Sequence, residues 1–267
     1  MHTRWMVLAA VAAFAGSSPL WAQRTSDQAR LSLGISAGAT AGTHLWTING
    51  QPLFDGPAQV DTMTISRRTR GSLAVVFHGT YFPGEHMGFT GEAMLLGLGH
   101  EDDCQLTFPT GSTRNAEVCN TIRSGESPST AVALSLGTMY RIWSRKVISP
   151  YLRANAGLVI TQHSPVETAG ISGLGTDTET DVIIYSDPSR GRANPVLGLG
   201  VGFTAALGHG YQLRWELRDN IVGIERVDGP TFGTPNLEPP HSRTFKHVIS
   251  MTFGFDVILE RRRGRRY

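Results

Sequence analysis

Seven charged residues lie in segments whose apolar residues recur at every second position. In an extended chain, each of these charged side chains would lie on the face opposite the apolar ones. Between residues 211 and 218, for example, charged and polar residues alternate strictly with large apolar ones. Successive side chains of a strand point to opposite faces, so these charges would share one face. A buried charge is expensive unless an opposite charge and hydrogen bonds compensate it. We therefore expect an ion-paired interior network made by Glu92, Arg153, Arg214, Glu216, Arg218, Lys246 and Asp256.

Two functions fit such a network, and the sequence leaves both open. It could line a polar passage that gates or conducts small solutes, or it could form a salt-bridged plug. If about eight strands enclose the network, the interior has room only for side chains, which favours the plug.

Cys104 and Cys119 are the only cysteines of the chain, with 14 residues between them. In an exported protein an even pair indicates a disulfide, which here would remove chain entropy worth roughly 3 kcal/mol. The alternative is a metal site with His100 and the acidic run 101–103. Two cysteines at this spacing fit no zinc pattern, so we predict a disulfide, no bound metal and no cofactor.

The elements that would hold these residues are eight segments with a two-residue apolar period, each 11 to 15 residues long. A tilted membrane strand needs ~9–11 residues, whereas soluble strands are usually ~5–6 residues long. The eight segments are 31–41, 71–82, 86–98, 129–142, 147–161, 193–207, 211–223 and 244–258.

The connections between these segments alternate in length. The short ones are 83–85, 143–146 and 208–210, and the long ones are 42–70, 99–128, 162–192 and 224–243. Short turns on one side and long loops on the other are typical of an outer-membrane barrel. The sequence therefore predicts an all-β fold, an eight-stranded antiparallel up-and-down transmembrane β-barrel.

The cost of placing charge in lipid decides which face points outward. An arginine at the bilayer midplane costs about 2–4 kcal/mol, so the charged face must point into the barrel. A soluble lipocalin-type barrel would reverse the two faces. It would then expose Gly198, Gly200 and Gly202 on the outside of one strand, where glycines weaken a strand without any gain in packing.

The chain resembles the small outer-membrane β-barrel family, the OmpA/OmpX-like eight-stranded group. The resemblance rests on the topology, on the glycine-alternating strand 197–203 and on the closing strand 249–255. It implies a bacterial outer-membrane location and a structural or surface-interaction role. It also implies outer-membrane lipids, lipopolysaccharide and the barrel-assembly machinery as partners. Family members usually end on an aromatic residue. Here Glu260 and an arginine-rich segment precede Tyr267, which leaves open whether Phe255 or a shifted register supplies the assembly signal.

An enzyme of the same architecture is the other alternative. Outer-membrane lipid A deacylases resemble this fold and use a His-x-Ser pair on one strand face. Here Ile249 stands where a serine would follow His247. His163–Ser164 and His241–Ser242 are neighbours in sequence and would point to opposite faces. We predict no catalytic residues.

The two ends of the chain differ from its body. Residues 1–22 have a basic start, an apolar run at 5–15 and Ala22 just before the expected cleavage site, as in a secretory signal peptide. The barrel is expected at 23–259 and a basic periplasmic tail at 260–267. Without Arg4, the five tail arginines and Glu260, the body has a net charge of about −3. We therefore expect no nucleic-acid partner, and we expect a monomer.

The long loops carry two groups of carboxylates, at 101–103 and at 167–187. They could hold divalent cations that bridge to lipopolysaccharide. The second group lacks the glycine turn and final glutamate of a calcium loop, so solvated loop charge is the preferred interpretation.

Overall fold

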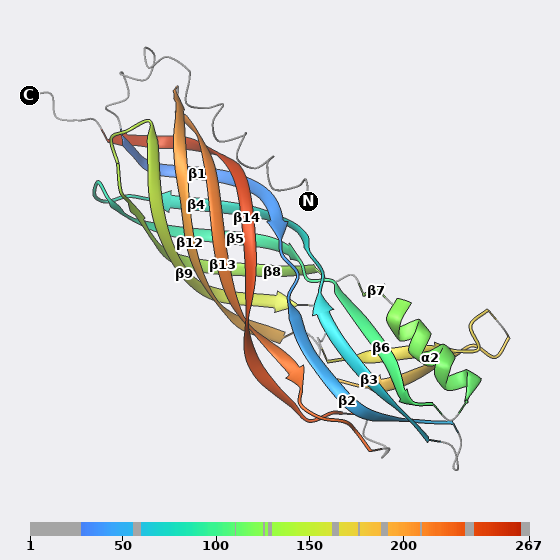
Figure 1. Cartoon of the computed structure of the whole chain (residues 1–267). Helices are drawn as coiled ribbons and strands as arrows, with labels where there is room; N and C mark the ends of the chain where they lie inside the picture. The colour runs from blue at the N-terminus through green and yellow to red at the C-terminus, as the bar shows by residue number, and fades with distance from the viewer. Residues whose placement is uncertain are drawn as a thin grey trace, which may run out of the picture.

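The computed structural model describes residues 28–55, 60–109, 111–124, 126–127, 130–161, 166–175, 177–187, 192–208, 210–232 and 238–262. It consists of a closed barrel with a smaller lobe at one end (Figure 1). The expected signal peptide at 1–22 and the last residues of the expected basic tail lie outside the described residues.

Eight antiparallel strands close the barrel in the order β1-β14-β13-β12-β9-β8-β5-β4. The first strand pairs with both the last strand and β4, so the barrel has no open edge along this seam. The strands are β1 (Gln28–Thr40), β4 (Ser72–Tyr81), β5 (Met87–Gly97), β8 (Thr130–Arg141), β9 (Ile148–Thr161), β12 (Arg192–Gly208), β13 (Tyr211–Val227) and β14 (His241–Arg262). Each overlaps one of the eight predicted segments, so the predicted fold is confirmed.

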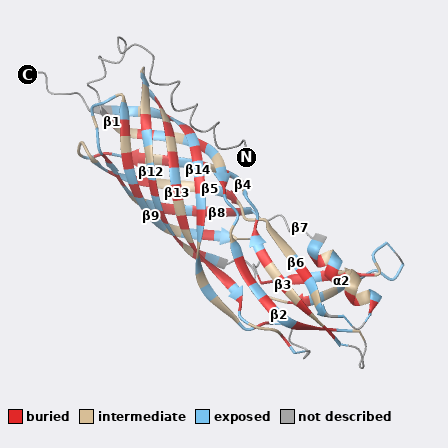
Figure 2. Cartoon of the chain, viewed as in Figure 1, coloured by how far each residue is buried: buried red, intermediate tan, exposed pale blue. Residues whose placement is uncertain are grey.

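Burial alternates along these strands, as the two-residue period requires (Figure 2). Glycines occupy inward positions where larger side chains need their space. A Cβ on Gly198 would lie 2.3 Å from Asn155 Oδ1, and one on Gly202 would lie 2.7 Å from the Tyr151 hydroxyl. The glycines of β12 therefore make room for polar and aromatic side chains of the neighbouring strand β9.

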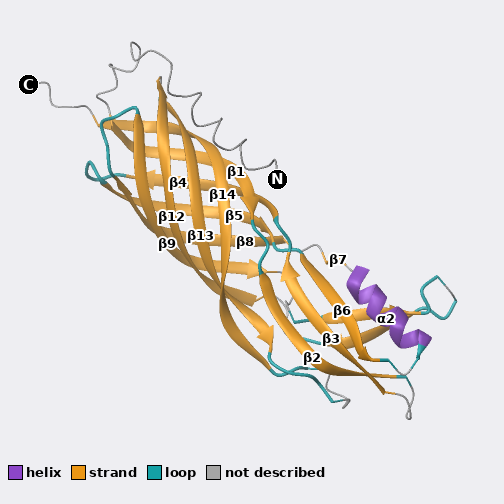
Figure 3. Cartoon of the chain, in the orientation of Figure 1, coloured by secondary structure: helices purple, strands orange, loops and turns teal. Residues whose placement is uncertain are grey.

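Three of the four predicted long connections are not simple loops, because they contain the strands and the helix of the lobe (Figure 3). A four-stranded sheet contains β2 (His44–Phe54), β3 (Val60–Thr69), β6 (His100–Phe108) and β7 (Glu126–Ser127). Helix α2 (Thr113–Ser124) packs against β6 and against a hairpin of β10 (Thr168–Ser172) and β11 (Thr180–Tyr185). These segments bury apolar side chains, which a free loop would leave exposed.

A single cluster of buried apolar side chains runs from the barrel interior into the lobe. On the lobe side it includes Trp46, Met63 and Ile65, and on the barrel side it includes Met94 and Val222. A buried polar contact adds to this joint, since the Gln51 side chain of β2 bonds to both Tyr185 and Thr231. The lobe is thus packed onto the barrel end that lies opposite the short turns.

Candidate functional site: the charged barrel interior

Six of the seven residues expected in the network lie at inward positions of four barrel strands. Their side chains are at most 4% exposed. Three carboxylates and three guanidinium groups come together, so their formal charges cancel. The six are Glu92 on β5, Arg153 on β9, Arg214, Glu216 and Arg218 on β13, and Asp256 on β14.

Glu92 and Glu216 form the centre of the network together with two arginines. Arg153 Nη2 lies 2.6 Å from Glu92 Oε2, and its Nη1 lies 3.4 Å from Glu216 Oε2. Arg218 also bonds to both carboxylates, with its Nε 2.7 Å from Glu216 Oε1 and its Nη2 3.0 Å from Glu92 Oε2. Each arginine therefore bridges the same two carboxylates, which links β5, β9 and β13 across the lumen.

Asp256 holds the second part of the network, nearer the short turns. Arg214 donates from Nη2 to its Oδ2 over 2.9 Å, and Gln212 donates to the same oxygen over 2.7 Å. His78 Nε2 lies 2.8 Å from Asp256 Oδ1. Arg214 Nη1 is also 3.9 Å from Glu216 Oε2, so the two parts touch.

Lys246 is the one expected member that the structure does not bring to this network. It lies near the lobe end of β14, opposite Val222, and is only partly buried. Ten residues of strand separate it from Asp256, which places it far outside ion-pair distance.

Four further polar side chains join the network, and the sequence analysis did not assign them to it: Tyr151, Asn155, Gln212 and His78. Tyr151 donates to Glu216 over 2.7 Å, and Asn155 donates to Glu92 over 3.0 Å. His78 shares the inward face of β4 with Val76 and Thr80, so the same two-residue period could have identified it.

An aromatic cap closes the interior at the short-turn end. Phe82, Met139 and Tyr151 form a separate buried cluster there. The guanidinium of Arg141 lies 3.4 Å from the centre of the Phe82 ring and donates to the backbone oxygen of Ala29 over 3.0 Å. These two contacts join the end of β8 to β1 and to the residue that follows β4.

On the lobe side of the network the interior becomes apolar. Met94, Leu96, Val159, Val196 and Val222 line this part, and Glu92 lies at its floor. The free space among the lining side chains is about 10 Å³, which is roughly what a single water molecule occupies. Little free space therefore remains among these lining side chains.

The outer wall of the barrel has the opposite character. Its strands expose large apolar side chains over most of their length, and Leu136, for example, is 75% exposed. Aromatic side chains lie near the short turns. Tyr211 stacks on Phe255 with ring centres 5.2 Å apart, and the Lys146 amine lies 4.4 Å from the centre of the Trp143 ring. Such aromatic rings mark the interfaces of membrane barrels.

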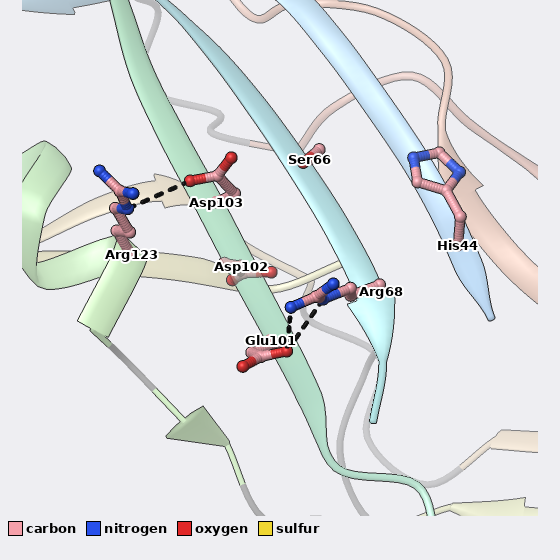
Figure 4. A pocket seen from close by; sticks show the side chains of 7 residues that line it. All are labelled: His44, Ser66, Arg68, Glu101, Asp102, Asp103 and Arg123. Carbon is pink, nitrogen blue, oxygen red and sulfur yellow. Dashed lines mark hydrogen bonds and ion pairs between the residues drawn. The ribbon is translucent and has the colours of Figure 1, made fainter. Parts of the chain in front are cut away.

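The predicted disulfide is confirmed, because Cys104 on β6 is bonded to Cys119 on α2. The nearby acidic run lines a groove of about 470 Å³ on the polar face of the lobe sheet (Figure 4). Its carboxylates pair with arginines, as in Arg68–Glu101 at 2.8 Å and Arg123–Asp103 at 3.5 Å. Within the described part of the chain, no group of three or more histidine, cysteine, aspartate or glutamate residues could hold a metal ion.

Of the residues considered for catalysis, His163 and Ser164 lie outside the described residues, whereas His247 and Ile249 lie on the outer wall. His247 pairs with Asp219 on that surface, and Ile249 follows on the same face of β14. A His-x-Ser arrangement would need a serine in place of Ile249.

Among the described residues, no helix has both the length and the apolar character needed to cross a membrane.

Comparisons with known proteins yield structural similarity only. No protein-family model and no curated protein sequence matches the chain. Among solved structures, it is similar to Neisserial surface protein A at 10% identity, with 86% of this chain and 97% of that chain covered and a TM-score of 0.43. It is also similar to the outer-membrane protein OprG of Pseudomonas aeruginosa, at 13% identity, 86% and 98% coverage and a TM-score of 0.42. A third is the outer-membrane protein AlkL in lipid bilayers, at 13% identity, 90% and 94% coverage and a TM-score of 0.37.

Proposed function

We propose that this chain is an integral protein of the bacterial outer membrane with a structural or surface-interaction role. The observation that carries the proposal is the opposite character of the two faces of the same eight strands. Their outward side chains are apolar and exposed, and their inward side chains are charged and paired. A closed barrel also satisfies its backbone hydrogen bonds without water, which is what the hydrocarbon requires.

In this role the barrel does not conduct. Glu92, Glu216 and Asp256 tie five strands together across the lumen, and the Phe82–Arg141 cap lies at one end. The apolar half and the lobe lie at the other end. The interior network is a plug that stiffens the barrel, and the lobe meets partners outside the cell.

The same proposal includes three partners, which are outer-membrane lipids, lipopolysaccharide and the barrel-assembly machinery. The outer wall would contact lipid directly, while β14 would supply the strand that the assembly machinery recognises. We propose a monomer, because the barrel closes on itself and needs no second chain to complete a sheet.

Electrophoresis of the membrane fraction with and without boiling tests the barrel. A folded barrel migrates differently from its heated form, and identical bands would contradict the proposal. Planar-bilayer recordings of the refolded protein then test the plug. We expect no conductance above that of the lipid alone, and stable single-channel steps would favour a small pore instead.

A lipid-modifying role has its own test. Mass spectrometry of lipid A from cells with and without the protein should give identical acylation patterns. A shift in acylation would replace the structural role with a catalytic one.

A further inference from the structure

We infer that strand β11 of the lobe binds an extended, positively charged peptide segment of an external protein, which adds to the β10–β11 hairpin as a third strand. The inference names a partner class for the surface-interaction role proposed above, and it rests on that role. The site, here named the open edge, comprises the backbone groups of Asp181 and Ile183 and their exposed side chains.

Helix α2 closes the other edge of the hairpin, along β10. Thr121 Oγ1 accepts a hydrogen bond from the backbone N–H of Ile171 over 2.8 Å and lies 3.1 Å from the carbonyl oxygen of the same residue. Both backbone groups of Ile171 therefore point toward α2 and away from β11. An edge whose backbone groups are occupied in this way is not available to another strand.

The same contact determines which groups β11 presents at its own edge. Opposite residues of an antiparallel pair either exchange both hydrogen bonds or exchange neither. Ile171 lies opposite Asp181 and exchanges neither, and the same holds two residues along, where Ala169 lies opposite Ile183. The N–H and C=O groups of Asp181 and Ile183 are thus directed away from β10. Among the described strands, β11 pairs with β10 alone, so no described strand takes up these groups.

The opposite face of β11 holds the strand in place. Val182 packs against the apolar core, and Ile184 and Tyr185 are buried in it. The Tyr185 hydroxyl also donates to Gln51 over 2.9 Å, which connects β11 to β2. A strand held in this way accepts a further strand without the ordering cost that a free loop would incur.

The charge around the open edge specifies a cationic partner. Between positions 154 and 189 the chain has no lysine or arginine, but it has five carboxylates, at Glu167, Asp177, Glu179, Asp181 and Asp187. Asp181 is exposed, and no described residue pairs with its carboxylate. Opposite charges on neighbouring strands attract, and like charges repel. The same repulsion disfavours a second copy of this chain, which would bring two acidic edges together.

The side chains of the open edge specify the order of residues in the partner. Glu179, Asp181 and Ile183 follow one another at every second position, and Ile183 is 49% exposed. In an antiparallel partner strand, an apolar residue would lie opposite Ile183, and basic residues would follow two and four positions later.

Isothermal titration calorimetry of the full chain in detergent micelles tests the inference. The probe is the end-blocked peptide Thr-Val-Thr-Lys-Thr-Lys-Thr. Two matched peptides carry either Glu in place of Lys, or N-methyl groups on Val and on the first Lys, whose N–H groups would face β11. We expect the first peptide to bind and the two matched peptides to bind at least tenfold more weakly.

Two variants address the charge and the backbone separately. Asp181→Lys should weaken binding of the first peptide about tenfold, because it replaces an attraction with a repulsion. Ile183→Pro should weaken it by a similar factor, because proline removes an outward N–H that the hairpin itself does not use. Ile183→Val keeps this N–H and the apolar side chain, and it should retain binding.

Asp103→Asn is the matched control for charge, since Asp103 is a 67% exposed carboxylate on the lobe sheet, where it pairs with Arg123. It should leave binding unchanged. In the unmodified chain, the bound peptide should also slow hydrogen exchange at the backbone amides of Asp181 and Ile183. This measurement needs no variant, and unchanged exchange at both amides would overturn the inference.

Equal affinity for the three peptides, or unchanged affinity in the Asp181→Lys and Ile183→Pro variants, would also overturn it. A dimer of the unmodified chain that Ile183→Pro abolishes would assign the edge to a second copy and overturn it as well. Every variant should keep its heat-dependent gel shift. Absence of peptide binding with an intact shift would contradict this inference alone, whereas loss of the shift in the unmodified chain would contradict the proposed barrel.

Discussion

At the scale of single residues, Glu216 is the point on which the interior charges converge. Its carboxylate bonds to Arg153, Arg218 and Tyr151 and lies near Arg214. Three arginines therefore depend on it for compensation in a place that water hardly reaches. Removing one partner of a buried ion pair is more harmful than never having built it.

Glu216→Gln should for this reason destabilise the barrel by about 3–5 kcal/mol. Denaturant unfolding in micelles, followed by tryptophan fluorescence, measures the loss. Glu260→Gln is the control, because Glu260 forms an exposed pair with Arg30 at 2.9 Å and should cost less than about 1 kcal/mol. Similar small losses in both variants would contradict a tightly coupled plug.

A second residue-scale prediction concerns Tyr185 in the lobe. Burial raises the pKa of its hydroxyl well above the ordinary value. A group whose pKa is raised on folding stabilises the protein below its unfolded pKa, and this contribution fades as the pH rises above about 10. Tyr185→Phe should remove this alkaline sensitivity and cost about 1 kcal/mol at neutral pH for the lost bond to Gln51.

Hydrogen exchange of the lobe amides between neutral and alkaline pH checks both parts of that prediction. If the lobe of the Tyr185→Phe variant opened with the same alkaline profile as the unmodified chain, another group would be responsible.

At the scale of elements, the barrel and the lobe depend on different forces. The disulfide fixes α2 to the sheet strand β6, far from the barrel network. Ser112 directly precedes helix α2, and its hydroxyl accepts the backbone N–H of Asn115 as an N-terminal cap. A 12-residue helix with a weak apolar face needs such external support.

Replacing Cys104 and Cys119 by serine should destabilise the lobe by roughly 3 kcal/mol. Limited proteolysis should then cut near α2, while the heat-dependent gel shift of the barrel stays unchanged. A matched sample of the unmodified chain treated with a reductant should behave in the same way. Simultaneous loss of the gel shift would mean that the lobe and the barrel unfold as one unit.

The sequence predicted the barrel strands because lipid on one side and a narrow interior on the other enforce a strict two-residue period. The lobe has no such uniform surroundings. The buried face of β3 carries Met63 and Ile65 but also Arg67, which pairs with Asp102 and lies 5.2 Å from the Trp46 ring. An arginine on the buried face breaks the apolar pattern, so β3 resembles a polar loop in sequence.

The same reasoning explains the candidate site. The inward position of each charged residue follows from the period alone, and six of the seven lie in contact with one another in the structure. Lys246 does not, because the period gives the face of a strand and not the level along the barrel axis. That level depends on strand tilt and register, which pair β14 with β13 and β1.

At the scale of the whole molecule, the orientation of every strand follows from which solvent surrounds the barrel. Leu136 lies near the middle of β8, opposite Gly91 and Ala156, and is 75% exposed on the outer wall. If hydrocarbon covers it, Leu136→Arg should destabilise the folded protein in a bilayer by about 2–4 kcal/mol. If water covered it, an arginine there would be nearly neutral.

Leu174→Arg provides the comparison, because Leu174 is 56% exposed in the lobe, beyond the barrel. That variant should fold into vesicles as efficiently as the unmodified chain. Reversible denaturant titrations in phospholipid vesicles, read by the heat-dependent gel shift, measure both free energies. A large penalty at Leu136 and none at Leu174 follows only if lipid meets the apolar wall and the arginines face the interior. Equal and small effects at the two positions would mean that water surrounds the wall, and the functions assigned to both faces would then have to be exchanged.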